Sequence, residues 1–327
     1  VGTGPYKLVD YQSGSYLKFE ANENYYKGEP SIKNVVFQII ENADTAILAL
    51  QNGEVDAYQM TPQQVKKLDL DASNLSTYSY SEGRVGYLEI NCNRVTDEKV
   101  RKALLYAMDR KAMDDAAFES SEYYSIPYTF LPTNSQFYTE DGVEKYEQDV
   151  DKAKSMLEDA GVSGLKLKLG YMSSDAVQSA QALLIQEQLK EVGVTVELAG
   201  GDGTAIANAM KDPDNEYDMY LGGYIMGIDP DTFSSLFEND GAYNYMHYSG
   251  YDTIDQLFEE GRSELDESAR KETYAKLQAA VQDTGAFYPI ISNNKILVVN
   301  NRIQGVEDAG LVPVYTFEDT SSLKIAE

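Results

Sequence analysis

The spacing of apolar residues changes twice along the chain, and this change constrains the fold more than any other feature. Residues 1–90 carry the alternating or continuous apolar runs that are typical of strands, as in Tyr6–Gln12 and Tyr16–Ala21. From Asp97 onward apolar residues recur every three or four positions, as in amphipathic helices, with strand patterns between them. Strand patterns return from residue 287. We therefore predict an α/β fold in which one domain is inserted into another.

The first part of the chain predicts several local elements. A turn around Gly14 joins the first two strands into a β-hairpin. Val35–Ile40 is predicted as a buried strand, and a short helix is predicted to start at an Asp44 cap and to stop at Gly53. Another strand follows at Val55–Met60. The order strand, helix, strand indicates a crossover connection within one sheet.

The rest of the chain predicts alternating helices and strands. Strands are predicted at Leu165–Tyr171, Thr195–Leu198, Tyr217–Leu221, Phe287–Ile291 and Ile296–Val299. Helices are predicted from Asp97 past Asp109, around Val150–Ala160, around Ile185–Val192, at 252–265 and at 267–284.

Charge and composition exclude several classes of function. The 327 residues include 54 Asp and Glu against 27 Lys and Arg, so the net charge is −27. Such a surface repels phosphate backbones and anionic lipids, which argues against binding to nucleic acid or to membrane surfaces. With one cysteine, Cys92, and one histidine, His247, the chain forms neither an internal disulfide nor a metal cluster of thiolates and imidazoles.

No catalytic set is visible in the sequence. His247 would have to serve any Ser/His/Asp triad, and no Gly-x-Ser-x-Gly motif supplies a nucleophile. Asp212–Glu216 begins like a calcium loop, but Tyr217 and Gly223 stand where that loop needs Gly and Glu. Gly200–Thr204 is predicted as a turn, because an embedded Asp opposes phosphate binding. We predict no catalytic residue, no metal site and no cofactor.

Tyrosine is the most abundant aromatic residue of the chain, which has 26 Tyr, 10 Phe and no Trp, and this excess is informative. A tyrosine ring combines an apolar body with a polar tip, which suits pockets that bind ligands by both area and hydrogen bonds. The alternative is that tyrosines fill half-buried strands. Five of them surround an Asp229-Pro230 pair that predicts a helix start: Tyr220, Tyr224, Tyr243, Tyr245 and Tyr248.

Six short motifs follow one another along the chain. They are VGTGPY at 1–6, NENYYKGEP at 22–30, LALQNGEVD at 48–56, VRKALLYAMDR at 100–110, KAKSMLEDAG at 152–161, and YIMGIDPDTFSSLF at 224–237 followed by YNYMHY at 243–248. Each motif alone is weak. Together, and in this order, they resemble the extracytoplasmic solute-binding proteins of peptide-type ABC importers, the family 5 group that binds oligopeptides, dipeptides or nickel.

The resemblance implies a two-lobed α/β fold of the periplasmic-binding-protein type II class, with mixed sheets and flanking helices. It also implies that the chain is incomplete at its N-terminus, because a further segment precedes the GTGPY strand in the family. Residues 1–88 and 289–327 would then belong to lobe I, and residues 89–288 would form lobe II. Two crossing strands, with Asn91 and Asn293 near them, would serve as the hinge.

The function implied by the resemblance is capture of short peptides between the lobes and delivery to the membrane permease of an ABC importer, without any reaction. The protein would be a monomer outside the cytoplasm, in the periplasm or tethered by a lipid on an N-terminal cysteine that precedes this chain. Alternatives are a metal chelate, sugar or haem as the solute, a signalling receptor, and a hydrolase of peptides or glycans.

The resemblance also implies a set of ligand-binding residues: Tyr224, Asp229, Asn244, Tyr245 and Tyr248. Tyr224 replaces the tryptophan that is usual in the ligand wall and adds a hydroxyl group. Gly227 aligns with an aspartate that pairs with the ligand amine in one oligopeptide-binding subtype. Asp229 is close enough in sequence to take over that role.

Overall fold

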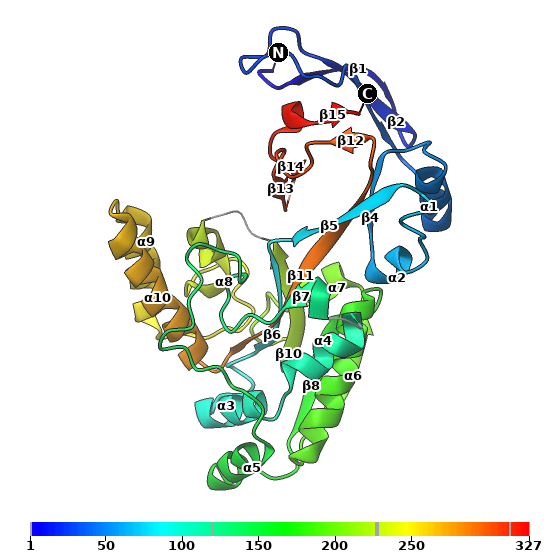
Figure 1. Cartoon of the computed structure of the whole chain (residues 1–327). Coiled ribbons are helices and arrows are strands. Elements are labelled where there is room, and N and C mark those ends of the chain that lie inside the picture. Colours follow the sequence, from blue (N-terminus) through cyan, green and yellow to red (C-terminus); the bar gives the residue numbers. More distant parts are fainter. Residues whose placement is uncertain (1, 119–120, 226–228, 314, 327) are drawn as a thin grey trace. The chain divides into compact units, whose positions relative to one another are not determined.

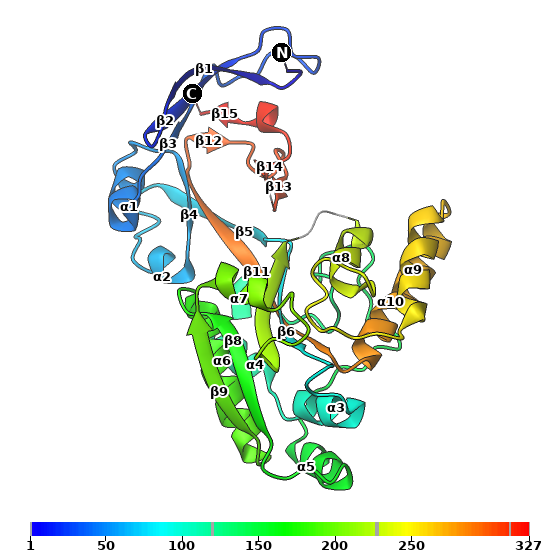
Figure 2. The same cartoon turned by 180° about the vertical axis from the view of Figure 1, so that it is seen from behind.

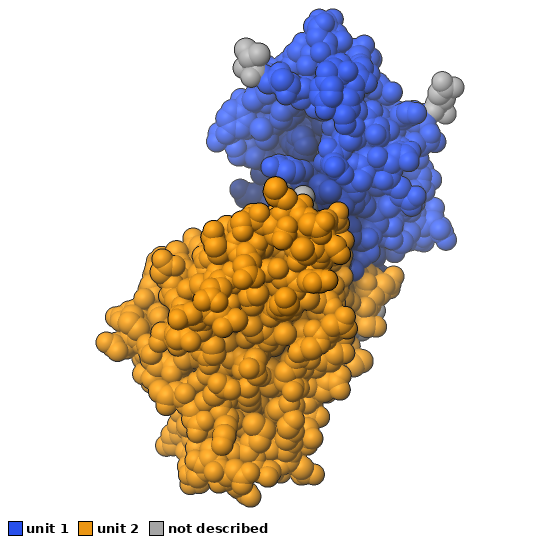
Figure 3. Space-filling model, turned by 90° about the vertical axis from the view of Figure 1, so that its left-hand side faces the viewer, with its two compact units in different colours: residues 1–82, 294–327 blue, residues 83–293 orange. Residues whose placement is uncertain are grey.

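The computed structural model describes residues 2–118, 121–225, 229–313 and 315–326. The chain forms two compact units, which Figure 3 shows in different colours. Unit 1 comprises residues 1–82 and 294–327, and unit 2 comprises residues 83–293. The second boundary falls inside one long strand, β11 (Phe287–Asn300). The predicted lobe boundaries at 88/89 and 288/289 concern a complete two-lobed protein and stay a prediction.

Unit 1 begins with the predicted β-hairpin, which is confirmed as β1 (Tyr6–Gln12) and β2 (Tyr16–Ala21). A third strand, β3 (Asn34–Gln38), pairs antiparallel with β2 and completes a separate sheet. The prediction that this strand is buried is wrong, because Val36 and Phe37 are 55% and 61% exposed. A continuous apolar run therefore does not mark a buried strand here.

The helix after β3 is α1 (Ala43–Gln51). Its cap is Asn42, whose side-chain oxygen accepts a hydrogen bond from the Thr45 amide at 2.9 Å, and not Asp44 as predicted. The next strand, β4 (Ala57–Met60), pairs with β11 in a different sheet from β3. The predicted crossover within one sheet is therefore wrong.

The remainder of unit 1 consists of short elements around the second half of β11, from Asn294 onward. They are α2 (Pro62–Val65), β5 (Leu75–Ser81), β12 (Ile303–Gln304), β13 (Leu311–Val312), β14 (Thr316–Phe317), the 3-10 turn η3 (Thr320–Ser322) and β15 (Lys324–Ile325). A small apolar core under these elements includes Tyr80, Leu297, Val299 and Val306.

Unit 2 is built on a sheet that contains, within the described residues, the first half of β11 and five further strands. They are β6 (Arg84–Ile90), β7 (Tyr124–Ser125), β8 (Lys166–Met172), β9 (Thr195–Gly201) and β10 (Met219–Ile225). The sheet order is β11-β6-β10-β8-β9, and β8 runs parallel to both β9 and β10.

The last predicted strands, at Phe287–Ile291 and Ile296–Val299, are one strand. Polar residues interrupt the apolar pattern between them, yet the backbone continues to pair there. Asn293 lies opposite Tyr124 on β7, and Asn294 lies opposite Ser81 on β5. Backbone pairing does not require apolar side chains, so the gap in the pattern was misleading.

The helices of unit 2 are α3 (Glu98–Tyr106), α4 (Arg110–Phe118), α5 (Val150–Asp159), α6 (Ala176–Glu191), α7 (Gly203–Ala209), α8 (Ser234–Phe237), α9 (Asp252–Ser263) and α10 (Glu267–Asp283). Two 3-10 turns, η1 (Ser121–Tyr123) and η2 (Pro230–Phe233), accompany them. The predicted continuous helix past Asp109 is wrong, because the chain breaks between α3 and α4. There the Asp109 side chain accepts from the Ala112 amide at 3.2 Å and starts a new helix.

Helices cover both faces of this sheet (Figure 1). Leu88 and Ile90 of β6 face a core shared with α3, α4, α5 and α6. Val85 and Tyr87, which alternate with them, face a second core shared with α8, α9 and α10. Of the helices that the structure describes, none combines the length and the apolar character needed to span a membrane.

Candidate functional site

Three parallel strands of unit 2 end at one edge of the sheet. The strands β8, β9 and β10 end at Met172, Gly201 and Ile225, and we call this the carboxyl edge (Figure 2). In open α/β sheets, ligands bind in the crevice outside the carboxyl ends of the strands. Tyr224, predicted to line the ligand, lies at this edge.

A row of four tyrosine rings extends from Tyr224 along β10 and the loop at 239–249. Ring centroids are 6.4 Å apart for Tyr224 and Tyr243, 6.2 Å for Tyr243 and Tyr245, and 6.0 Å for Tyr245 and Tyr220. The Tyr224 hydroxyl also lies 3.4 Å from the Ser235 hydroxyl. The structure thus brings Tyr224 and Tyr245 into one array, which we call the tyrosine row.

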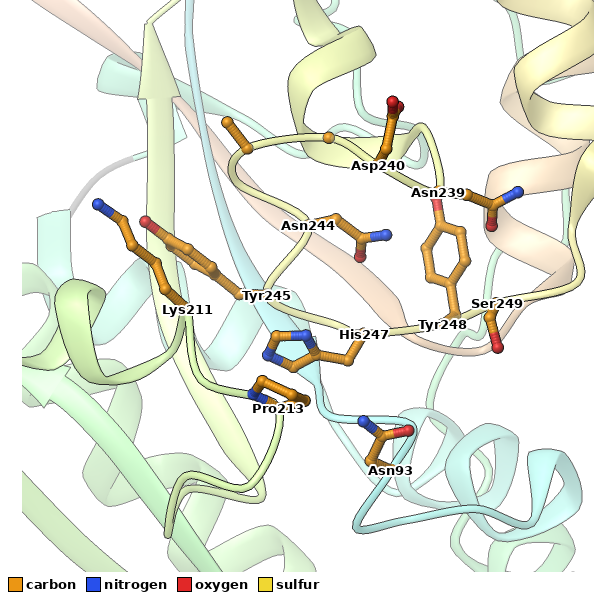
Figure 4. A pocket seen from close by; sticks show the side chains of 12 residues that line it. Asn93, Lys211, Pro213, Asn239, Asp240, Asn244, Tyr245, His247, Tyr248 and Ser249 are labelled. Atoms are coloured by element: carbon orange, nitrogen blue, oxygen red, sulfur yellow. The ribbon is translucent and has the colours of Figure 1, made fainter.

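A cavity of about 440 Å³ lies beside the 239–249 loop (Figure 4). Asn244, Tyr245 and Tyr248 line it, together with His247 and Lys211. The Asn244 side-chain nitrogen donates to the Glu238 carbonyl at 3.2 Å, whereas its side-chain oxygen is buried without a partner. A buried acceptor without a donor costs free energy, so this oxygen favours a ligand that brings an N–H or O–H group.

Two residues of this cavity wall mainly hold the loop in place. Tyr248 is only 3% exposed, and its hydroxyl donates to the Phe237 carbonyl. The His247 imidazole Nε2 lies 2.7 Å from the Met210 carbonyl, and the residue has a φ of 49°. Because this contact occupies Nε2, the ring is not poised as the base of a Ser/His/Asp triad.

Asp229 already has a partner of opposite charge. Its two carboxylate oxygens accept hydrogen bonds from one Arg270 nitrogen at 2.9 and 2.7 Å, and it caps η2 by accepting from the Asp231 amide. Burial opposes ionisation of Asp229, but its hydrogen bond to Arg270 lowers the pKa below the ordinary value. A ligand amine would have to share this carboxylate with Arg270. Gly227, the other position considered for the amine, lies outside the described residues.

The sequence reasoning missed Glu89, the next-to-last residue of β6, which pairs with Tyr220 of β10 on one side and with Phe287 of β11 on the other. Its side chain is fully buried, and neither carboxylate oxygen has a hydrogen-bond partner. Burial raises its pKa well above the ordinary value. The signal was an acidic residue within the otherwise apolar run from Val85 to Ile90.

The two residues predicted near the hinge lie in different settings. Asn293 is the last residue of unit 2 before the boundary inside β11. Asn91 directly follows the last residue of β6, at the end of that strand that lies away from the 82/83 boundary. It is buried, and its side-chain oxygen accepts a hydrogen bond from the Asn93 amide at 3.0 Å. Their role in a hinge stays a prediction.

Within the ranges that the structure describes, no group of three or more His, Cys, Asp and Glu side chains is arranged to hold a metal ion.

Comparison with known proteins decides the family. Residues 1–245 match the bacterial extracellular solute-binding proteins, family 5. The chain belongs to this family. The identification made from the six motifs is thereby confirmed.

Solved structures of similar proteins agree. A substrate-binding protein of an ABC transporter from Listeria monocytogenes is 38% identical with a TM-score of 0.93, and the match covers 100% of this chain and 67% of that one. A putative peptide-binding protein from Clostridium difficile is 33% identical with a TM-score of 0.91, over 98% and 67% of the two chains. The predicted α/β fold of the periplasmic-binding-protein type II class is confirmed.

A curated relative is more distant. The oligopeptide-binding protein AppA of Bacillus subtilis is 26% identical over 328 residues, which cover 92% of this chain and 58% of that protein. The chain therefore spans little more than half the length of this relative.

Proposed function

We propose that the full-length protein captures short peptides outside the cytoplasm and delivers them to the membrane permease of an ABC importer. The observation that carries the proposal is the family match over residues 1–245. Relatives named for oligopeptide and dipeptide binding, each 26% identical, support peptides as the solute. The protein would act as a monomer.

The chemistry of the carboxyl edge suits such a solute. The tyrosine row offers ring faces for peptide side chains, and its hydroxyl groups offer hydrogen bonds to the peptide backbone. Burial raises the pKa of Tyr245 to about 12, so its hydroxyl keeps its proton at neutral pH and is able to donate. The partnerless oxygen of Asn244 would accept from a peptide N–H.

The same geometry supports binding without a reaction. The single imidazole, His247, is engaged by the Met210 carbonyl, and no carboxylate hydrogen-bonds this ring in the described part of the chain. The related proteins named above are binding proteins and not enzymes. A hydrolase would lose turnover on replacement of His247, so a peptidase assay of the full-length protein separates the two classes.

Isothermal titration of the full-length protein with a library of di- to hexapeptides tests the proposal. We expect binding by the unmodified protein and about tenfold weaker binding, about 1.4 kcal/mol, by Tyr224→Ala or Tyr245→Ala. Tyr26→Ala, which truncates a ring that is 77% exposed in unit 1, is the matched control and should bind normally.

Two other relatives are named for binding different solutes, and the titration includes both of these solutes. A nickel-binding protein and a haem-binding protein are each 24% identical to this chain. Binding of a nickel chelate or haem without binding of any peptide would move the proposal from peptides to that class.

A further inference from the structure

Arg84 is the first residue of β6 and lies at the carboxyl edge. It lies opposite Ile225, the last residue of β10, so the start of β6 and the end of β10 meet at this edge. The guanidinium therefore belongs to the region in which open α/β sheets bind their ligands. Its side chain is half-buried and projects from the face opposite to that of the Tyr224 ring, because neighbouring strand positions alternate.

The sheet is shaped to make room for this side chain. Gly86 and Gly223 lie opposite each other on β6 and β10. A Cβ atom on Gly223 would lie 2.0 Å from one guanidinium nitrogen of Arg84, and a Cβ atom on Gly86 would lie 3.3 Å from another. Any side chain at 223 would displace the guanidinium. The two glycines thus form a floor on which the planar group lies.

Arg84 also differs from the other arginines in its partners. Arg94, Arg262, Arg270 and Arg302 pair with carboxylates, and Arg101 and Arg110 donate to backbone carbonyls. Within the described residues the guanidinium of Arg84 makes neither an ion pair nor a hydrogen bond, although its backbone pairs with β10. This is notable in a chain with 54 acidic side chains against 27 basic ones.

A guanidinium has five N–H donors in a rigid fork, and the fork matches the two oxygens of a carboxylate. We propose that Arg84 binds a carboxylate of the solute, so that this protein selects peptides with a free carboxyl group. The inference rests on the proposed function and narrows its solute class. The carboxylate comes from either the peptide C-terminus or an acidic side chain.

Titration of the full-length protein with three peptides separates these sources. Ala-Ala-Ala carries a C-terminal carboxylate, Ala-Ala-Ala-amide carries none, and Ala-Glu-Ala-amide carries one only on its side chain. We expect the unmodified protein to bind one of the carboxylate peptides at least tenfold more tightly than Ala-Ala-Ala-amide, because hydrogen bonds between charged groups are stronger than those between neutral groups.

Two variants test the residue itself. Arg84→Gln should bind that carboxylate peptide no better than Ala-Ala-Ala-amide, whereas Arg84→Lys should keep part of the preference because it keeps the charge. Lys276→Gln removes a charge from the exposed face of α10 and should leave all three affinities unchanged. Unchanged melting temperatures would show that each variant is folded.

The outcomes are distinct. If Arg84→Gln retains the full carboxylate preference, or if the unmodified protein binds all three peptides equally, the role of Arg84 is refuted and peptide binding stands. If the unmodified protein binds none of the peptides, the proposed function fails, and the carboxylate proposal fails with it.

Discussion

The buried carboxyl group of Glu89 should make the stability of unit 2 depend on pH. Burial raises the pKa of this group well above its ordinary value of 4.5, so the folded protein holds a proton that the unfolded chain releases above pH 4.5. The stability of the folded state therefore falls as pH rises from 4.5 to the raised pKa. One unit of pH within that window corresponds to about 1.4 kcal/mol.

The variant Glu89→Gln keeps the shape of the side chain but cannot ionise. Near pH 4.5 it should be about as stable as the unmodified protein, because both side chains are then neutral and neither carboxylate oxygen of Glu89 has a partner. Between pH 5 and pH 6 the variant should gain about 1.4 kcal/mol relative to the unmodified protein, and the gain should continue until the raised pKa is reached. Equilibrium unfolding in urea at half-unit pH steps measures this difference.

The control for this series is Glu187→Gln, which changes an exposed glutamate on α6. Its free energy of unfolding should follow that of the unmodified protein at every pH. A constant difference between Glu89→Gln and the unmodified protein from pH 4.5 to pH 7 would refute the reasoning, since it would mean that the buried group does not retain its proton.

Two further changes follow from the cores of unit 2. Burial raises the pKa of Asp114 to about 8, so Asp114→Asn should gain stability over the unmodified protein as pH rises above 4, and the gain should level off above about pH 8. Urea unfolding at pH 5, 7 and 9 measures this gain. A gain that shrinks as pH rises would contradict the raised pKa of Asp114. Phe130 is fully buried, with ring centroids 4.9 Å and 5.0 Å from those of Phe233 and Phe237, so Phe130→Ala should lower the free energy of unfolding by about 3–5 kcal/mol and Phe130→Leu by less. Surface substitutions usually change stability by less than about 1 kcal/mol, so a loss below that for Phe130→Ala would show that the ring is not part of a packed core.

Local patterns predicted local structure well. The hairpin of β1 and β2 was predicted with its observed ends, because alternation and a glycine turn act over a few residues. The start of η2 at Asp229 was also predicted from its cap. The errors arose where two local solutions compete. Asn42 caps α1 in place of Asp44, and Asp109 starts a new helix where the apolar period alone predicted continuation.

The candidate site was predicted only in part, because its residues are brought together by register and by the path of loops. The sequence motifs singled out Tyr224, Asn244 and Tyr245, and the structure places two of these in the tyrosine row and two in the wall of one cavity. Their contact with a ligand stays a proposal. No pattern in the sequence indicated that Arg270 already occupies Asp229.

What the sequence determined by itself is the family and the order of its elements, because ordered motifs and apolar periods are properties of neighbouring residues. What only the tertiary structure decided is the state of single charged groups. Glu89 is buried because Tyr220 and Phe287 lie on either side of it, and Arg84 has a place because two glycines meet across the β6–β10 pair. Burial and the absence of a partner depend on residues more than a hundred positions away along the chain, and local spacing carries no record of them.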